Sequence, residues 1–155
     1  MKIDQKAPEF KLLDQDGRNV SLKDFKGEWL VLYFYPKDNT KGCTLEAVDF
    51  TRLLGKFEKL KANVVGVSPD SIESHCKFIE KQKLKLTLLS DESKKVLEKY
   101  GVWKEKSMYG RKYMGVVRTT FLIDASGKIS YIWEKVKVNG HAKEVLDKLK
   151  EIERK

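Results

Sequence analysis

A nearly continuous apolar run at residues 29–35 (WLVLYFY) constrains the fold of this chain more than any other feature. Branched and aromatic side chains dominate the run, and Pro36 ends it. A strand that is covered on both faces needs such a run, whereas a half-exposed strand alternates apolar and polar residues. The run therefore predicts a central, parallel strand with helices packed on both sides of its sheet.

The rest of the chain alternates between short strand patterns and helical patterns. Before the central strand we expect a hairpin, formed by residues 10–13 and 19–22 around a turn at residues 14–17. After the central strand we expect a helix whose apolar face bears Leu53, Leu54, Phe57 and Leu60, and then a strand at 63–68. The next helix has Asp70 as its cap and Ile72, Cys76 and Ile79 on its apolar stripe. A strand at 86–89, a helix around 92–99, strands at 118–124 and 129–134 and a terminal helix after Gly140 complete the order. This order predicts a mixed α/β sheet between helices, with an N-terminal β-hairpin and an antiparallel edge. No repeat or linker interrupts residues 1–155, so we expect a single domain.

Charge and cysteine content narrow the functional classes. The 155 residues include 32 Lys and Arg against 23 Asp and Glu, a net charge of +9, but the lysines are dispersed among acids and no basic run reaches five residues. This favours a solvated surface over nucleic-acid binding. No apolar stretch is long enough for a membrane span, and no apolar run follows the N-terminal lysines as in a secretory signal. With only two cysteines, Cys43 and Cys76, we expect an intracellular, cytoplasmic protein with reduced thiols.

The segment with the clearest chemistry is the polar loop at residues 37–42, which joins the central strand to the start of a helix. Reactive groups in α/β sheets usually lie at this end of a strand. Cys43 falls in the first helical turn, where the helix dipole and unpaired N–H groups favour the thiolate. Thr40 is placed to cap the helix or to hydrogen-bond the sulfur, and Pro36 to shield it. The polar loop and Gly42 favour an exposed, reactive thiol over a buried core cysteine.

The same segment resembles a known family. Pro36-x-x-x-Thr40-x-x-Cys43 matches the active-site motif of the peroxiredoxins, and residues 35–46 are similar to their bacterioferritin comigratory protein branch, also called PrxQ. The resemblance continues through residues 66–71 (GVSPDS), 88–91 (LLSD), 118–124 (RTTFLID) and 135–141 (KVKVNGH). Because these blocks occur in order over nearly the whole chain, the resemblance is specific. It implies a thioredoxin-like fold.

The resemblance also implies a role for each matching residue. Cys43 would be the peroxidatic cysteine, whose thiolate attacks a peroxide oxygen and becomes sulfenic acid. Thr40 and Arg118 would hydrogen-bond the peroxide and the thiolate, Pro36 would limit solvent access, and Glu46 would orient the arginine. The alternative for Arg118 is a surface salt bridge at a strand start. Hydrogen peroxide and small alkyl hydroperoxides would be the substrates, without haem, flavin or metal, and thioredoxin or a similar thiol reductant would regenerate a monomeric enzyme.

The chain departs from the family pattern at two positions. Many members carry a resolving cysteine five residues after the first, where this chain has Val48, and many have proline where it has Lys41. Cys76 is the only other thiol, and some relatives of the branch place a resolving cysteine on this following helix. It shares an apolar stripe, so the alternative is a core residue. In that case the enzyme would use one cysteine and an external thiol.

Two rival functions are less consistent with the residues. A thiol–disulfide oxidoreductase on the same fold uses C-x-x-C and a cis-proline facing the site, but the chain has neither that spacing nor any proline after Pro69. A non-enzymatic basic module would bind nucleic acid with steep salt dependence. A zinc site would need four ligands, namely Cys43, His75, Cys76 and His141. The chain has neither C-x-x-C nor H-x₃₋₅-H spacing, so no metal is expected and both histidines are expected on the polar surface.

Overall fold

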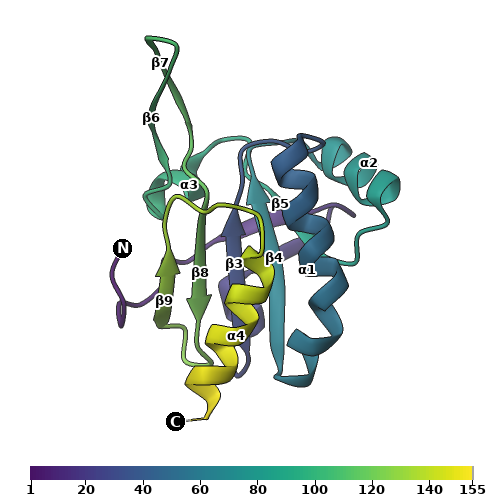
Figure 1. Cartoon of the computed structure of the whole chain (residues 1–155), viewed down its shortest axis with the longest axis vertical. Coiled ribbons are helices and arrows are strands. Elements are labelled where there is room, and N and C mark those ends of the chain that lie inside the picture. Colours follow the sequence, from purple (N-terminus) through teal and green to yellow (C-terminus); the bar gives the residue numbers. More distant parts are fainter. Residues whose placement is uncertain (155) are drawn as a thin grey trace.

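The computed structural model describes residues 1–154, so Lys155, the last residue of the expected domain, lies outside the described part. A seven-stranded sheet has the order β2-β1-β5-β4-β3-β8-β9 (Figure 1). The central strand is β3 (Trp29–Phe34), and five of its six residues are buried. The other strands of this sheet are β1 (Lys11–Asp14), β2 (Asn19–Ser21), β4 (Ala62–Ser68), β5 (Thr87–Ser90), β8 (Thr119–Ile123) and β9 (Ile129–Trp133).

Strand directions confirm the expected mixed sheet. β3 pairs in parallel with β4, which pairs in parallel with β5, while β8 pairs antiparallel with β3 and β9 antiparallel with β8. The N-terminal hairpin adds β1 and β2, antiparallel, to the far edge beside β5. β3, parallel to β4 on one side and antiparallel to β8 on the other, carries the continuous apolar run because both faces of the sheet are covered there.

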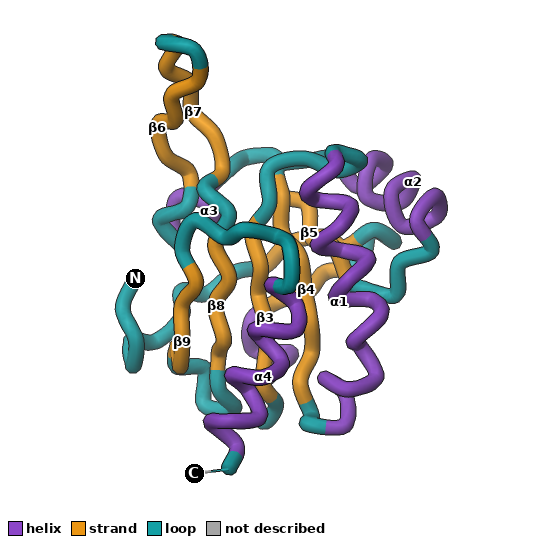
Figure 2. Tube along the Cα trace, viewed as in Figure 1, coloured by secondary structure: helices purple, strands orange, loops and turns teal. Residues whose placement is uncertain are grey.

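Helices cover both faces of the sheet (Figure 2). α1 (Lys41–Lys59), α2 (Ile72–Gln82) and α4 (His141–Glu153) pack on the face that receives Val31 and Tyr33 of the central strand. The opposite face, which receives Leu30 and Leu32, is covered by α3 (Lys95–Lys99) and by η1 (Leu22–Phe25), a 3-10 helix that was not expected. Successive side chains of β3 thus enter two separate hydrophobic cores.

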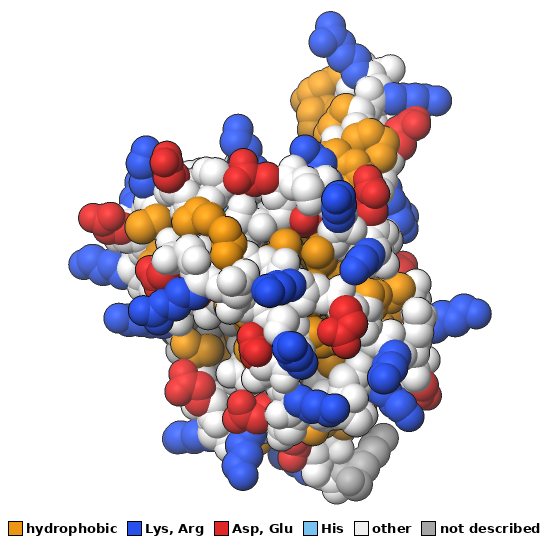
Figure 3. All heavy atoms as spheres, turned by 180° about the vertical axis from the view of Figure 1, so that it is seen from behind, with side chains coloured by type: hydrophobic (Ala, Val, Ile, Leu, Met, Phe, Trp, Pro, Cys, Tyr) orange, Lys and Arg blue, Asp and Glu red, His pale blue; other side chains and the backbone are white. Residues whose placement is uncertain are grey.

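One hairpin was missed from the sequence. β6 (Trp103–Met108) and β7 (Arg111–Val116) form a separate two-stranded sheet that projects from the body of the molecule (Figure 1). Its apolar side chains stay exposed among basic ones, as the view from behind shows (Figure 3); they are Met108, Tyr109, Tyr113 and Met114. Because neither face of the hairpin is buried for most of its length, its residues show no alternation of apolar and polar types.

Smaller differences concern element boundaries. The helix expected around 92–99 is only five residues long, and β1 begins at Lys11 rather than Phe10. The cap of α2 is Ser71, whose hydroxyl accepts a hydrogen bond from the Ser74 amide, rather than Asp70. Asp70 instead binds the loop that precedes α1. Within residues 1–154, no helix combines the length and apolar character needed to cross a membrane.

Candidate active site

Cys43 lies in the first turn of α1, directly after the loop that leaves the central strand. Its position confirms the expected helix start, where backbone N–H groups and the helix dipole favour a thiolate. The expectation of an exposed thiol is wrong, because only 1% of the residue is accessible. Gly42 contributes to this burial by letting another side chain approach: a Cβ at this position would lie 3.0 Å from Nη2 of Arg118.

Arg118 comes from the segment between β7 and β8 and contacts the sulfur directly. Its Nη2 group donates a hydrogen bond to Cys43 Sγ at 3.0 Å, and its Nη1 group donates to Glu46 Oε1 at 3.2 Å. The arginine side chain is 20% exposed, and the Glu46 side chain is 1% exposed. Arg118 is therefore not a surface salt bridge. A fixed guanidinium at this distance favours the anionic form of the thiol.

Glu46 lies one helical turn after Cys43 and faces the same interior. Burial raises the pKa of its carboxyl from 4.5 to about 7, although the charge and hydrogen bond of Arg118 act in the opposite direction. Among the described residues, neither Glu46 Oε2 nor the neighbouring Tyr33 hydroxyl has a hydrogen-bond partner. The pKa of Tyr33 is raised well above its usual value, first by burial and then by the negative charges of Glu46 and Cys43. Tyr33 therefore remains a neutral phenol beside the site.

Thr40 and Pro36 lie on the same loop, and in the described part of the chain neither forms a hydrogen bond with the sulfur. Thr40 is the residue that precedes α1, and its hydroxyl donates to the Lys37 carbonyl at 2.9 Å. Thr40 is the N-cap residue of α1, as expected, but its side chain makes no capping hydrogen bond. Pro36 is half-buried where the loop begins. The structure thus assembles Cys43, Arg118 and Glu46, with Thr40 at the entrance of the helix.

This geometry can be compared with that of known proteins. A family model described as the AhpC/TSA family matches residues 3–132. The chain belongs to the AhpC/TSA family. It is similar to a peroxiredoxin Bcp of Bacillus subtilis, with 48% identity over 155 residues, 100% of this chain and 99% of the relative. A peroxiredoxin Bcp of Escherichia coli K12 is 44% identical and covers 97% of each chain.

Solved structures lead to the same branch. The bacterioferritin comigratory protein of Xanthomonas campestris superposes with a TM-score of 0.87 at 44% identity, over 91% of this chain and 90% of that one. A PrxQ variant of Xylella fastidiosa gives a TM-score of 0.92 at 42% identity, over 97% and 96%. These likenesses confirm the thioredoxin-like fold and the Bcp/PrxQ branch of the peroxiredoxins that the motifs indicate.

The second thiol of this peroxiredoxin lies on the surface. Cys76 is exposed on α2, whereas its neighbours His75 and Phe78 form the buried side of the helix. The alternative of a core residue for Cys76 is therefore wrong. Both cysteines are free thiols in this structure, one buried and one exposed.

The two histidines are buried, contrary to the expectation of a polar surface. His75 is fully buried and His141 is 3% exposed. His141 contacts the Thr120 hydroxyl at 2.8 Å, and burial lowers the pKa of its imidazole despite the opposing effect of Glu144. Within residues 1–154, neither histidine forms a group with Cys43 that could hold a metal ion. The acidic and imidazole atoms that do cluster belong to Asp38, Asp70 and His75, and protein hydrogen bonds already engage them.

Lys106 of the projecting hairpin is a second cation near the peroxiredoxin site, after Arg118, and sequence reasoning missed it. Its ammonium donates to the Val116 carbonyl at 2.7 Å. Burial is the main cause that lowers its pKa, Arg118 acts in the same direction, and the negative charge of Cys43 acts against both. No sequence signal indicated this residue, because the hairpin itself was not expected.

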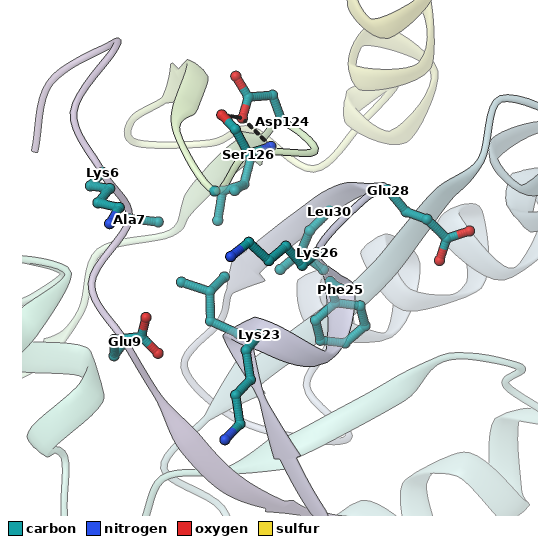
Figure 4. A pocket seen from close by; sticks show the side chains of 13 residues that line it. Lys6, Ala7, Glu9, Lys23, Phe25, Lys26, Glu28, Leu30, Asp124 and Ser126 are labelled. Carbon is teal, nitrogen blue, oxygen red and sulfur yellow. Dashed lines mark hydrogen bonds between the residues drawn. The ribbon is translucent and has the colours of Figure 1, made fainter.

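A pocket away from these residues does not belong to the site. It has a volume of about 100 Å³ and lies between the N-terminal segment and the start of β3 (Figure 4). Its lining includes Lys6, Leu22, Phe25, Lys26 and Asp124, and none of the residues around Cys43. The pocket therefore lies apart from the candidate site around Cys43.

Proposed function

We propose that this protein is a thiol peroxidase in which Cys43 is the peroxidatic residue. The thiolate attacks one oxygen of a hydroperoxide, the O–O bond breaks, and the sulfur becomes sulfenic acid. The leaving oxygen takes the bonding electron pair and then a proton, giving water or an alcohol. The observation that carries this proposal is the Arg118 guanidinium, which lies 3.0 Å from the sulfur and is held by Glu46.

Arg118 serves two stages of this reaction. Before attack, its charge stabilises the thiolate, and during attack it stabilises the charge that develops on the leaving oxygen. Glu46 holds the guanidinium in one orientation, while Thr40 and Pro36 limit the access of solvent and substrate to the sulfur. The reaction needs only the thiolate and these donors, so we propose no haem, flavin or metal.

We propose that Cys76 resolves the sulfenic acid. Its thiolate would attack Cys43, form a disulfide and release water. The exposed position of Cys76 on the neighbouring helix supports this role. Because Cys43 is buried, the start of α1 must open before the sulfurs can reach bonding distance. An external thiol remains the alternative resolving partner.

The relatives suggest the substrates and the reductant. The Xanthomonas campestris protein has structures that concern alkyl peroxide reduction, which supports alkyl hydroperoxides alongside hydrogen peroxide for this chain. Two structures of a peroxiredoxin Q from the same organism carry cysteine-to-serine changes at two different positions. We propose thioredoxin or a similar dithiol protein as reductant, a monomer acting in the cytoplasm, and residues 1–155 as one functional domain.

The deciding experiment is mass spectrometry without reductant after one equivalent of hydrogen peroxide, with and without a sulfenic-acid trap. We expect the parent protein to lose two hydrogens and to link the peptides of Cys43 and Cys76. Cys76→Ser should instead retain a trappable oxygen on Cys43, and Cys43→Ser should consume no peroxide. Trapped sulfenic acid in the parent, with Cys76 still free, would support the external thiol. Unchanged steady-state turnover in Cys43→Ser would refute the peroxidatic role.

A further inference from the structure

A buried ion pair connects the loop before Cys43 to the helix that carries Cys76. Asp38 lies in that loop, and its side chain is 1% exposed. His75 lies on α2 with a fully buried side chain, and its Nδ1 atom is 2.7 Å from Asp38 Oδ2. The mechanism above uses neither residue. Buried charged groups are costly unless they are paired and hydrogen-bonded, so this pair calls for an explanation.

The hydrogen bonds around His75 and Asp38 indicate which of their atoms carry protons. His75 Nε2 lies 2.9 Å from the Leu89 carbonyl, which can only accept, so Nε2 carries a proton. A second proton lies between Nδ1 and the carboxylate, and the pair is neutral as a whole whichever atom holds it. Tyr35 donates to Asp38 Oδ1 at 2.6 Å, and burial raises its pKa well above the usual value, so it keeps its proton. Ser74 donates to Oδ2 at 2.7 Å.

Asp70, which lies between β4 and α2, binds the backbone of the loop that contains Asp38. The amide of Asp38 donates to Asp70 Oδ2 at 2.8 Å, and the Ser68 hydroxyl donates to the same oxygen at 2.7 Å. The Ser90 hydroxyl donates to the Asp70 carbonyl at 2.6 Å. Asp38 therefore connects the loop to the ends of β4 and β5 and to α2. Through that loop it fixes where α1 begins.

We propose that Asp38 and His75 act as a latch that holds the start of α1 closed for reaction with peroxide and must open for the disulfide to form. The proposal rests on the proposed function, in which Cys43 is oxidised and Cys76 resolves it. While the pair is intact, Cys43 stays under Arg118, and Cys76 lies on the outer side of α2. Opening the pair frees the loop and with it the first turn of α1.

The latch predicts opposite effects on two chemical steps. Attack on peroxide requires the closed loop, so weakening the pair slows the formation of sulfenic acid. Disulfide formation requires the open loop, so the same change speeds the linkage of Cys43 to Cys76. A residue that only stabilised the fold would not shift the two rates in opposite directions. His75 and Asp38 are positioning residues in this account, because neither touches the reacting atoms.

Two substitutions of His75 separate its contact with Asp38, which is the latch, from its contact with the Leu89 carbonyl. In His75→Gln, the amide nitrogen can replace Nε2 and donate to Leu89, but Asp38 loses its partner at residue 75. In His75→Asn, the amide nitrogen can replace Nδ1 and donate to Asp38, but the bond to Leu89 is lost. His141→Gln removes a different buried histidine and is the matched control. Stopped-flow fluorescence gives the peroxide rate, and quenched-flow mass spectrometry gives the linkage rate.

We expect His75→Gln to lower the peroxide rate about tenfold, the scale of one lost charge-assisted hydrogen bond, and to raise the linkage rate several-fold. His75→Asn should stay within about threefold of the parent in both steps. If His75→Gln fails to fold, Ser74→Ala removes another donor to the same carboxylate and should shift both rates in the same directions. Parallel slowing of both steps, as in a general loss of stability, or no change in either step, would overturn the latch.

The oxidation products of the parent protein distinguish failure of the latch from failure of the proposed function on which it rests. If the parent forms sulfenic acid on Cys43 but never links it to Cys76, the latch is overturned while the peroxidase function stands. If the parent forms no sulfenic acid, the proposed function fails as well.

Discussion

Replacing Glu46 by glutamine tests the cost of a buried carboxylate in this site. The substitution keeps an oxygen that can accept from Arg118 Nη1, so the guanidinium keeps its partner, and it removes the ionisable group. Because burial raises the pKa of Glu46 from 4.5 to about 7, the folded protein holds this proton more tightly than the unfolded chain does. The parent should therefore lose stability relative to the variant as pH rises.

The size of this loss follows from linkage. A group with a raised folded-state pKa contributes stability that is fully present below its unfolded pKa and is lost as pH rises through the folded pKa. Each unit of difference is worth about 1.4 kcal/mol. Between pH 5 and pH 8, most of the titration takes place, and the free energy of unfolding of the parent should fall by about 2 to 3 kcal/mol relative to Glu46→Gln.

The measurement is urea unfolding of both proteins at pH 5, 6, 7 and 8 in a Cys43→Ser background, which prevents oxidation at that position. Glu58→Gln, on the exposed side of the same helix, is the control and should show a nearly constant difference from the parent. A difference between Glu46→Gln and the parent that stays constant with pH would refute the argument that burial raises this pKa. A difference that grows toward low pH would contradict its sign.

The remaining predictions concern the packing around the site. Arg118→Lys keeps a positive charge but cannot donate to Cys43 and Glu46 from one plane. The second-order rate constant with peroxide should therefore fall about 100-fold, with an unchanged circular dichroism spectrum. A rate constant near that of the parent would contradict the role of the guanidinium. Gly42→Ala places a Cβ 3.0 Å from Arg118 Nη2 and should slow the reaction with peroxide about tenfold. Gly55→Ala on the same helix meets nothing within 4 Å, so it should leave that rate unchanged and add about 0.5–1 kcal/mol of stability. Equal peroxide rates in the two variants would contradict this prediction. Gly66→Ala places a Cβ 2.8 Å from Tyr33 Cζ and should lower the free energy of unfolding by about 1–3 kcal/mol in urea titrations, and a neutral result would show that the ring can move aside.

The strands of the sheet were predictable where their burial requires a recognisable pattern of apolar residues. The run at 29–35 became the central strand because both of its faces are covered, and the closing pair of strands became an antiparallel edge. The hairpin of β6 and β7 was not predictable by the same reasoning. Its side chains pack against almost nothing, so solvent exposure removes the periodicity on which the prediction depends.

The site was predictable in part, because part of it is local. Cys43, Thr40 and Pro36 lie within eight residues and form a linear motif at a helix start. Arg118 is 75 positions away from Cys43, so only the family resemblance associated the two residues, and only the fold shows the 3.0 Å contact between them. The burial of Cys43 could not be deduced from its polar loop, because the covering group, Arg118, is distant in the sequence and reaches the site from the start of the neighbouring strand β8.

The orientation of α2 shows why polarity alone misplaced two residues. Treating cysteine as apolar and histidine as polar turns Cys76 inward and His75 outward, and the structure has the reverse. The cause is a buried acid 37 positions earlier, since Asp38 offers the imidazole a partner that makes its burial favourable. Once His75 points inward, its neighbour on the helix must point outward. The same pairing that holds the loop of Cys43 therefore leaves the thiol of Cys76 in solvent, where it is accessible for reaction.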